Sequence, residues 1–286
     1  MDRKYRDRSP VCDPQALRSH FPLIYIIVKH MNRPCVYKER RMNMQSTDTL
    51  LELDKMNLFH VIQPIMNVKQ NVVMGYEFLL RSLQCQNPEL LFRHAHQQNQ
   101  LIDLDMKSIF QIFDTIGRHH PLEGITYFIN IYPSTLMNVH FLHKMEEYLS
   151  NSNINPSSIV FELNEGERNT DYALLKNTIA QYKKIGFLIA LDDYGKGESG
   201  LISFLEVEPS IMKVDLYFTK NLSRSTERQK IILHLLRLCD KDVTLVLEGI
   251  ETEEDLRTAK DLGVSFSQGY YLGRPQPLPY YIPEIL

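Results

Sequence analysis

Residues 187–195 read Phe-Leu-Ile-Ala-Leu-Asp-Asp-Tyr-Gly, an apolar run of five residues that stops on two adjacent aspartates. A short apolar run bounded by polar residues and glycine is typical of a buried strand. Apolar residues recur at helical spacing over 172–185, immediately before it. A helix that leads into a buried strand is the repeating unit of a parallel sheet, so this stretch predicts an α/β fold.

The same unit recurs along the chain. Apolar runs that predict strands lie at 59–66, 72–80, 127–131, 159–163, 187–191, 211–214, 244–247 and 266–272, and helical spacing lies at 136–149, 172–185, 227–240 and 253–262. About eight strands over roughly 230 residues match a (β/α)8 barrel, which typically has ~250 residues. Only residues 67–71 separate the first two runs, which is too short for a helical crossover. We therefore predict a TIM-like (β/α)8 barrel with an antiparallel first strand.

The charge of the chain is small in total but unevenly distributed. The 286 residues include 32 Lys and Arg against 35 Asp and Glu, a net charge of −3. Residues 1–46 carry ten basic and four acidic side chains, so the remainder has a net charge of −9. This balance excludes a strongly basic nucleic-acid scaffold, and we expect neither DNA nor RNA as a partner. We predict one domain over 51–286, preceded by a basic N-terminal arm, residues 1–50, that is disordered or precedes the native start.

Apolar runs and cysteines indicate the compartment. The longest apolar run, 21–28, has eight residues, whereas a bilayer-spanning helix needs ~20, so no membrane span is expected. The four cysteines form neither a C-x-x-C pair nor a disulfide framework. A reducing cytoplasm fits this pattern best.

Seven of the predicted strands end on a carboxylate, an amide or an ammonium group. The residues concerned are Glu77, Asn130, Glu162, Asp192, Asp193, Lys213, Glu248 and Gln268. The carboxyl ends of barrel strands converge on one rim, where barrel enzymes have their active sites. A single acid after a strand is more often a helix N-cap, but so many in one register predict a shared site.

The residue types at this rim indicate metal chemistry. Five carboxylates gathered together repel one another and raise each other's pKa. Divalent cations relieve that repulsion, and carboxylate and amide oxygens suit Mg²⁺ or Mn²⁺. With one lysine among them, the set is suited to hydrolysis at phosphorus through two metal ions.

The sequence resembles the EAL-domain cyclic di-GMP phosphodiesterase family from about residue 59 to residue 277. Phe78 stands where the family usually has alanine, and the loop 194–200 departs from the family's form. The motifs that carry the resemblance occur in the family's order: Gly75-Tyr76-Glu77-Phe78-Leu79-Leu80-Arg81, Phe128-Ile129-Asn130-Ile131, Phe161-Glu162-Leu163-Asn164-Glu165, Asp192-Asp193-Tyr194-Gly195, Met212-Lys213-Val214-Asp215, Glu248-Gly249-Ile250-Glu251-Thr252 and Gln268-Gly269-Tyr270-Tyr271.

This resemblance implies a hydrolase that converts cyclic di-GMP to linear pGpG in bacterial signalling, with two Mg²⁺ or Mn²⁺ ions in each active site of a homodimer. It implies that Glu248 is the general base and that Lys213 positions the water or neutralises phosphate charge. Arg81 would contact a ligand phosphate, and Gln268 would lie at the edge of the site. Glu165 and Glu251 would anchor loops. The implied metal ligands are Glu77, Asn130, Glu162 and Asp192 for one ion and Asp193, with Asp192 shared, for the other.

Two alternatives remain open from the sequence. The altered loop 194–200 leaves the metal ligands in place but could weaken the coupling between dimer and site, which would give a catalytically weak or inactive cyclic di-GMP receptor. The segment 195–200 also fits G-x-G-x-x-G, the pattern of a dinucleotide-binding oxidoreductase. We rank this last, because Asp192, Asp193 and Glu198 would face a pyrophosphate that no metal neutralises.

Overall fold

The computed structural model of the chain describes residues 53–85, 87–118, 122–163, 167, 170–195, 200–239 and 242–282. The chain divides into two compact units, one of residues 50–276 and one of residues 1–49 together with 277–286. The first unit contains the barrel, and the described part of the second contains α12 (Leu278–Tyr281). The predicted N-terminal arm, residues 1–50, lies outside the described residues, so its boundary stays a prediction.

Eight strands close into a single barrel in chain order. The strands are β1 (Leu58–Asn67), β2 (Val72–Ser82), β3 (Thr126–Ile131), β4 (Ile159–Leu163), β5 (Leu188–Tyr194), β6 (Ile211–Val214), β7 (Thr244–Leu247) and β8 (Phe266–Gln268). β1 is antiparallel to both of its neighbours, β2 and β8, and the remaining neighbouring pairs are parallel. The predicted barrel with an antiparallel first strand is therefore confirmed.

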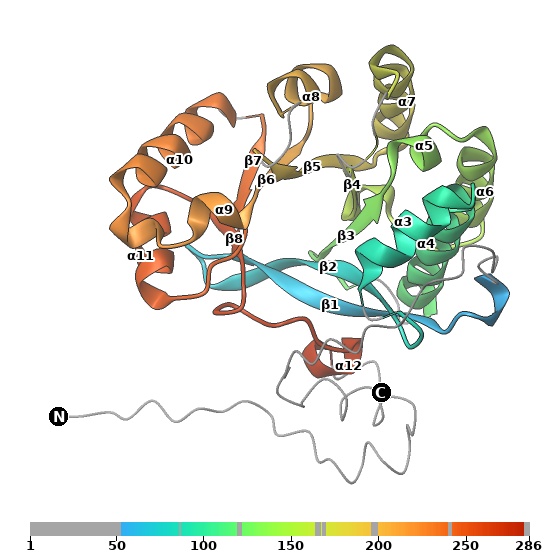
Figure 1. Ribbon diagram of the computed structural model, residues 1–286, viewed down its shortest axis with the longest axis horizontal. Helices are drawn as coiled ribbons and strands as arrows, with labels where there is room; N and C mark the ends of the chain where they lie inside the picture. Colours follow the sequence, from blue (N-terminus) through green and yellow to red (C-terminus); the bar gives the residue numbers. More distant parts are fainter. Residues whose placement is uncertain are drawn as a thin grey trace, which may run out of the picture. The chain divides into compact units, whose positions relative to one another are not determined.

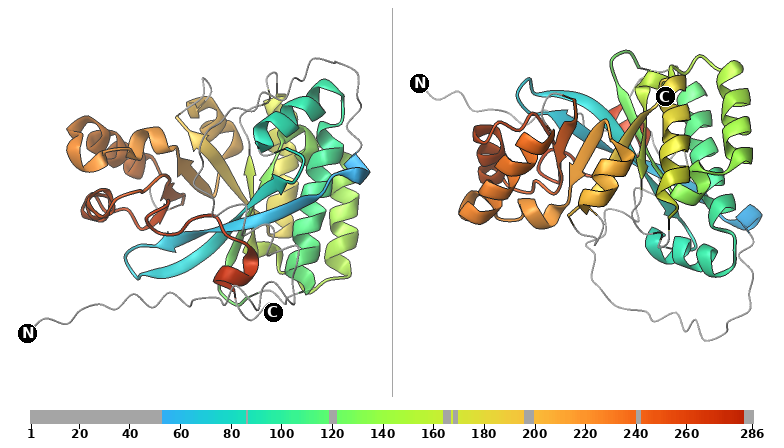
Figure 2. Two further views of the ribbon diagram at one scale, coloured as in Figure 1. Left: turned by 60° about the horizontal axis from the view of Figure 1, so that its bottom comes forward. Right: turned by 90° about the horizontal axis from the view of Figure 1, so that it is seen from above.

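The helices lie outside the ring of strands (Figure 1, with two further views in Figure 2). In the barrel unit they are α3 (Pro88–Gln97), α4 (Leu101–Arg118), α5 (Pro133–Leu136), α6 (Val139–Ser150), α7 (Tyr172–Ile185), α8 (Gly200–Val207), α9 (Leu216–Thr219), α10 (Thr226–Cys239) and α11 (Glu253–Asp261), with the short 3-10 turns η1 (Leu53–Lys55), η2 (Pro156–Ser158) and η3 (Leu222–Arg224). The helix predicted at 172–185 coincides with α7, whereas the sequence patterns above did not name α3 and α4. Among the described residues, none of the helices combines the length and apolar character that crossing a bilayer requires.

Local capping fixes where several helices begin and end. The side chains of Asn138, Asp171 and Thr252 accept hydrogen bonds from backbone N–H groups in the first turns of α6, α7 and α11. Such caps satisfy donors that have no partner within the helix. Gly186 ends α7 with φ of 115°, a left-handed conformation that glycine adopts without steric cost.

The interior of the barrel is closed by one apolar layer. Its residues come from six different strands: Ile65, Phe128, Val160, Ala190, Ile211 and Val246. Glycine occupies the corresponding place on β2, because the Phe128 ring lies within 2.9 Å of the position of a Cβ added at Gly75. This layer fills the interior of the barrel and forms the floor of the space above it.

Gly75→Ala is expected to destabilise the barrel strongly. A Cβ at this position would lie 2.2 Å from the backbone oxygen of Thr126, so β2 and β3 would have to separate. We expect a loss of about 1–3 kcal/mol in the free energy of unfolding, measured by urea denaturation. Gly117→Ala is the matched control, because its Cβ would meet only the Tyr148 hydroxyl at 3.3 Å and alanine favours a helix. Equal stability of the two variants would contradict this account of the layer.

Candidate active site

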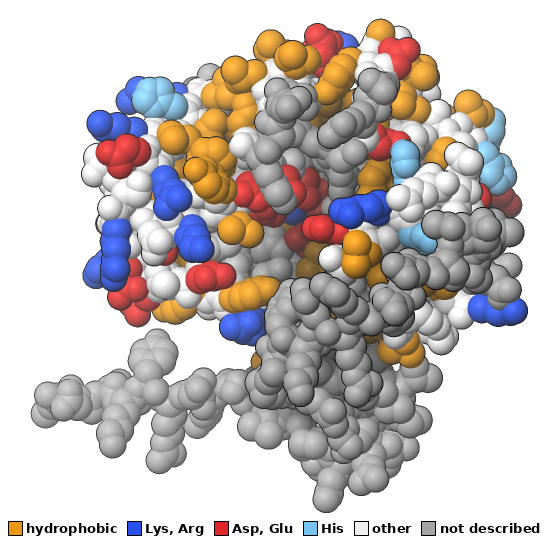
Figure 3. Space-filling model, viewed as in Figure 1, with side chains coloured by type: hydrophobic (Ala, Val, Ile, Leu, Met, Phe, Trp, Pro, Cys, Tyr) orange, Lys and Arg blue, Asp and Glu red, His pale blue; other side chains and the backbone are white. Residues whose placement is uncertain are grey.

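The site is the layer of side chains directly above the apolar floor. On five successive strands, the residue two positions after a floor residue is polar: Asn130 follows Phe128, Glu162 follows Val160, Asp192 follows Ala190, Lys213 follows Ile211 and Glu248 follows Val246. Residues two apart on a strand face the same side of the sheet. The polar residues therefore point into the barrel at its carboxyl-terminal mouth, and Figure 3 shows acidic side chains gathered at the centre of this face.

Lys213 lies at the centre of four carboxylates. Its Nζ atom is 2.7 Å from Glu162 Oε1, 2.8 Å from Glu248 Oε1, 2.9 Å from Asp192 Oδ1 and 3.5 Å from Glu77 Oε2. An ammonium group has three N–H donors, which matches three short contacts and one longer one. The lysine and glutamate side chains of this centre are largely buried, with Lys213 1% exposed and Glu162 fully buried.

Two amide side chains hold the carboxylates from the other side. Asn130 Nδ2 donates to Glu77 Oε1 at 3.2 Å and to Glu162 Oε2 at 3.3 Å. Gln268 Nε2 donates to Glu77 Oε2 at 2.7 Å. Glu77 is thus tied to strands β3 and β8 as well as to Lys213, and its carboxylate has little freedom to turn.

The electrostatics of this cluster are unbalanced. Four carboxylates surround one ammonium, which would leave a net charge of −3 if all were ionised. Burial, together with the neighbouring acids, raises the pKa of Glu162 well above its usual value and raises the pKa of Glu248 to about 8. Burial acts to lower the pKa of Lys213, but the surrounding carboxylates raise it well above its usual value. The cluster therefore holds its lysine charged and has capacity for further positive charge.

The carboxylate and amide oxygens of the cluster have the chemistry that hard metal ions require, but the carboxylate oxygens contact Lys213. Carboxylate and amide oxygens are the ligands that Mg²⁺ and Mn²⁺ prefer. In the described part of the chain, no group of three or more His, Cys, Asp or Glu side chains is spaced to hold a metal ion. The ammonium of Lys213 stands between the carboxylates and acts as their shared counter-ion.

Asp193 occupies an irregular point of β5. Its backbone φ is 52°, in the left-handed region that few non-glycine residues adopt. The pairing between β5 and β6 shifts register between Leu191 and Tyr194, so Asp192 and Asp193 do not follow regular strand alternation. The contacts of the cluster involve Asp192, and the role of Asp193 as a metal ligand stays a prediction.

The structure locates the remaining predicted residues as follows. Arg81 lies on β2 opposite Phe59; burial lowers the pKa of its guanidinium, although Glu77 and Tyr270 act to raise it. Gln268 is buried against Glu77, inside the cluster. Glu251 is exposed and precedes α11. Glu165 and residues 196–199 of the loop lie outside the described residues.

Two features of β1 and β2 differ from the expectations drawn from strand ends. β2 continues to Ser82, so Glu77 lies in the middle of its strand and does not end it. Gln63 lies opposite Glu77 on β1 and donates from Nε2 to the Gly273 carbonyl at 3.0 Å. Sequence reasoning missed Gln63 as a neighbour of the site, because it looked for polar residues at the ends of strands. β1 runs in the opposite direction to β2, so its polar residue at the mouth, Gln63, comes before its floor residue, Ile65.

The departure from the family pattern at Phe78 does not reach the cluster. Phe78 follows Glu77 and therefore faces the opposite side of the sheet. Its ring packs against His60 and Tyr127, with centroids 6.3 and 6.2 Å away. The larger side chain is accommodated behind the sheet.

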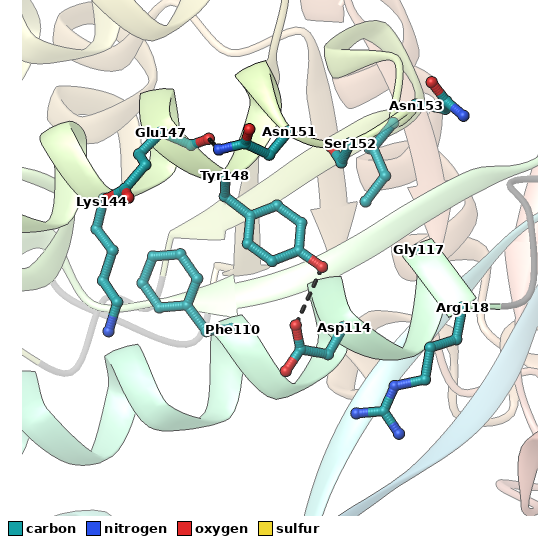
Figure 4. Close-up of a pocket in the computed structure, with 11 residues that line it drawn as sticks. Phe110, Asp114, Gly117, Arg118, Lys144, Glu147, Tyr148, Asn151, Ser152 and Asn153 are labelled. Carbon is teal, nitrogen blue, oxygen red and sulfur yellow. Dashed lines mark hydrogen bonds between the residues drawn. The ribbon is translucent and has the colours of Figure 1, made fainter.

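A separate cavity of about 560 Å³ lies between α4 and α6 (Figure 4). Phe110, Asp114, Arg118, Lys144 and Tyr148 line much of it, and the Tyr148 hydroxyl donates to Asp114 at 3.1 Å. Its lining includes none of the residues of the strand-end cluster.

Comparison with known proteins gives a consistent family. The sequence profile described as "EAL domain" matches residues 47–275. The probable cyclic di-GMP phosphodiesterase PdeA of Escherichia coli is 26% identical over 79% of this chain and 31% of its own length, and the cyclic di-GMP phosphodiesterase PdeF of the same organism is 27% identical over the same shares. The chain thus spans about a third of the length of these relatives.

Solved structures share the fold. The calcium and cyclic di-GMP complex of BlrP1 from Klebsiella pneumoniae is 25% identical, with a TM-score of 0.69, over 77% of this chain and 56% of that one. A manganese and cyclic di-GMP complex of the same protein is equally similar. A standalone EAL protein from Vibrio cholerae, bound to cyclic di-GMP, is 26% identical with a TM-score of 0.70 over 78% of this chain and 93% of that one.

Lys213→Met is expected to destabilise the metal-free chain. The substitution removes the counter-charge of four carboxylates, of which Glu77 and Glu162 are buried, and breaking a buried ion pair by removing one partner costs about 3–5 kcal/mol. Urea denaturation in EDTA at pH 8 measures the loss. Lys176→Met is the control, because Lys176 pairs with Glu208 at 2.9 Å on the surface, where such pairs contribute about 0–1 kcal/mol. Equal losses in the two variants would show that Lys213 is not the required counter-ion.

Proposed function

The chain belongs to the EAL domain family, and from that premise we propose that it hydrolyses cyclic di-GMP to linear pGpG with two divalent metal ions. The observation that carries this proposal is the buried layer of carboxylates and amides at the mouth of the barrel, whose negative charge exceeds what Lys213 neutralises. The relatives named as cyclic di-GMP phosphodiesterases and the neighbours solved with this ligand support the choice of substrate.

Glu77, Asn130, Glu162 and Asp192 are proposed to hold one ion, and Asp193, sharing Asp192, the second. When bound, the ions supply Lewis-acid polarisation of the phosphate and lower the pKa of a bound water. For ions to bind, the Lys213 ammonium has to leave the centre of the carboxylates, and Asn130 has to present its amide oxygen where its nitrogen now donates. Mg²⁺ and Mn²⁺ are proposed because the donors are all oxygen atoms.

Glu248 is proposed as the general base. A water oxygen forms a bond to phosphorus, and the proton of the water passes to the Glu248 carboxylate. The bond from phosphorus to one ribose oxygen breaks, and that oxygen takes up a proton from solvent and leaves as a hydroxyl group. Glu248 suits this role because its side chain is 18% exposed and therefore accessible from the mouth, whereas Glu162 below it is fully buried.

Cationic side chains offset the charge of the substrate. Lys213, once displaced from the carboxylates, is proposed to position the water or to neutralise phosphate charge. Arg81 lies four residues beyond Glu77 on the same strand and is proposed to contact a phosphate of the ligand. Gln268 is proposed to support the site by orienting Glu77.

A homodimer is proposed through the exposed face of α8. Leu201, Ile202 and Leu205 on this helix are 65%, 59% and 66% exposed. Three large apolar side chains on one short helix form a patch of the kind that marks a protein interface. The helix begins at Gly200, a few residues after Asp192 and Asp193, so a partner on this face would bear directly on the loop beside the site. A cytoplasmic location is also proposed, since Cys85 and Cys239 are free thiols.

The second candidate is a cyclic di-GMP receptor without turnover. The observation that favours it is that the carboxylates surround Lys213. Among the described residues, no three His, Cys, Asp or Glu side chains are placed so that they could hold a metal ion. The dinucleotide-binding oxidoreductase is set aside, because Asp192 is engaged with Lys213 in the carboxylate cluster of an EAL domain.

Glu248→Gln is expected to abolish hydrolysis while the chain still binds cyclic di-GMP. The amide keeps the shape but cannot accept the proton, so kcat should fall by about 10²–10⁴-fold. Turnover is measured as pGpG release in Mg²⁺ and in Mn²⁺, and binding by calorimetry in Ca²⁺. Glu254→Gln, on the exposed first turn of α11, is the matched control and should keep full activity. Binding without hydrolysis by the unaltered protein in both metals would favour the receptor.

Leu205→Glu is expected to make the protein monomeric, because a carboxylate in an apolar interface loses its hydration. Sedimentation velocity over a range of concentrations measures the change. Val139→Glu on α6 is the control, since Val139 is equally exposed, at 68%, but lies on another helix. A dimer that persists in Leu205→Glu would show that the interface lies elsewhere. A monomer in the unaltered protein would show that there is no homodimer.

A further inference from the structure

Asp105 is a buried acid that the chemistry above does not use. It lies on α4, is 2% exposed, and has Leu104 and Met106 as buried neighbours on the same helix. Burial raises its pKa to about 7, although hydrogen bonds from the Tyr132 backbone and from Thr135 act to lower it. Burying a carboxyl group in this position lowers the stability of the fold, and an apolar side chain of similar size would be buried at a smaller cost in free energy. Its position therefore calls for a role that an apolar residue cannot fill.

Asp105 holds the segment that leads out of β3. Its Oδ2 atom accepts a hydrogen bond from the Tyr132 backbone N–H at 2.9 Å. Tyr132 lies two residues after Asn130 and is the N-cap of α5, a position for which tyrosine is a poor residue. The next residue is Pro133, which has no N–H to donate. Asp105 therefore holds the backbone of the N-cap residue itself, from a helix that lies 27 residues earlier in the chain.

Glu167 holds the other side of the same turn. Its Oε2 atom accepts a hydrogen bond from the Ser134 backbone N–H at 2.7 Å. Glu167 lies five residues after Glu162, on the segment that follows β4. The start of α5 is therefore held between a carboxylate of α4 and a carboxylate that follows the neighbouring strand.

The two strands joined in this way carry facing residues of the cluster. Asn130 on β3 and Glu162 on β4 are register partners, and Asn130 Nδ2 donates to Glu162 Oε2 at 3.3 Å. β3 ends at Ile131, so beyond Asn130 only one residue of strand pairing restrains the backbone. A shift of the turn at Tyr132 would be transmitted directly to the Asn130 side chain, whose amide must be aimed to within a fraction of an ångström to serve a metal.

We propose that Asp105 and Glu167 are positioning residues that fix the Asn130 amide relative to Glu162 by holding the turn after β3 from both sides. The proposal rests on the proposed metal-dependent function, in which Asn130 is a ligand. Neither residue touches the reacting atoms, and both act through backbone N–H groups. Loss of an orienting partner of a metal ligand typically weakens metal affinity by about 10–100-fold.

The test measures Mn²⁺ binding without substrate, by the electron paramagnetic resonance signal of free Mn²⁺. Asp105→Ala and Glu167→Ala should each weaken Mn²⁺ binding by about 10-fold or more, and Asp105→Asn, which keeps an oxygen acceptor, should restore most of it. Hydrogen exchange should accelerate at the Tyr132 amide in Asp105→Ala and at the Ser134 amide in Glu167→Ala. In turnover assays kcat should fall in parallel while KM for cyclic di-GMP changes little.

Asp114→Ala is the matched control on the same helix. Asp114 accepts a hydrogen bond from the Tyr148 hydroxyl at the α4–α6 cavity, whose lining residues do not include the turn after β3 (Figure 4). Its loss should lower stability without changing Mn²⁺ affinity. Should Asp105→Ala fail to fold, Glu167→Ala and Asp105→Asn carry the same comparison.

Normal Mn²⁺ affinity in a folded Asp105→Ala and in Glu167→Ala would overturn the proposal, as would an equal loss in Asp114→Ala. The failure of the proposed function gives a different result, because the unaltered protein itself would then bind Mn²⁺ without producing pGpG. Absence of Mn²⁺ binding by the unaltered protein would overturn both.

Discussion

Closure of the barrel is the constraint on which the rest of the structure depends. On the parallel strands that place an apolar residue in the floor, the residue two positions later lies in the mouth, even on β5, which becomes irregular at Asp192 and Asp193. On the antiparallel β1 the order is reversed, and Gln63 precedes the floor residue Ile65. Asn130, Glu162, Asp192, Lys213 and Glu248 are brought together in this way from five strands. No contact between their loops is needed, and the burial of Lys213 and Glu162 strengthens the interactions between their charges.

The cluster shows how an acidic protein can accept an anionic ligand. Its carboxylates would repel a phosphate if they stood alone, but they are arranged around positive charge, here the ammonium of Lys213. Divalent ions bound to these carboxylates would supply more positive charge than the single ammonium does, and the ammonium of Lys213 could then contact the proposed substrate. The oxygen atoms that contact Lys213 are also those proposed to bind the metal ions. The acidity of the body and the proposed anionic substrate are consistent for this reason.

Acids outside the cluster shape its surroundings through backbone hydrogen bonds. Asp105 accepts from Tyr132, Asp215 from Tyr217 at 2.7 Å and Asp255 from Ser223 at 2.8 Å. All three are buried, and each holds a turn that follows or faces a strand of the barrel. In addition, the Thr219 hydroxyl donates to the Glu248 carbonyl, and Leu216 fills the position that a Cβ at Gly249 would occupy. The segment after β7 therefore packs against the turn after β6. The residues of the cluster lie on or directly after strands, and these contacts hold the turns that connect those strands.

The sequence by itself determined the barrel, its antiparallel first strand and most members of the cluster, because apolar runs, helical spacing and strand alternation are local properties. Asn130, Glu162, Asp192, Lys213 and Glu248 could be named in advance for this reason. The tertiary structure decided which of them meet: that Lys213 is the centre of four carboxylates, that Glu77 acts from the middle of a long strand, and that Gln63 lies across from it. It also decided the pairing of Asp105 with Tyr132, over 27 residues of chain. These contacts depend on the stagger and closure of the strands and on how buried charges balance one another, and no local pattern of residues encodes either.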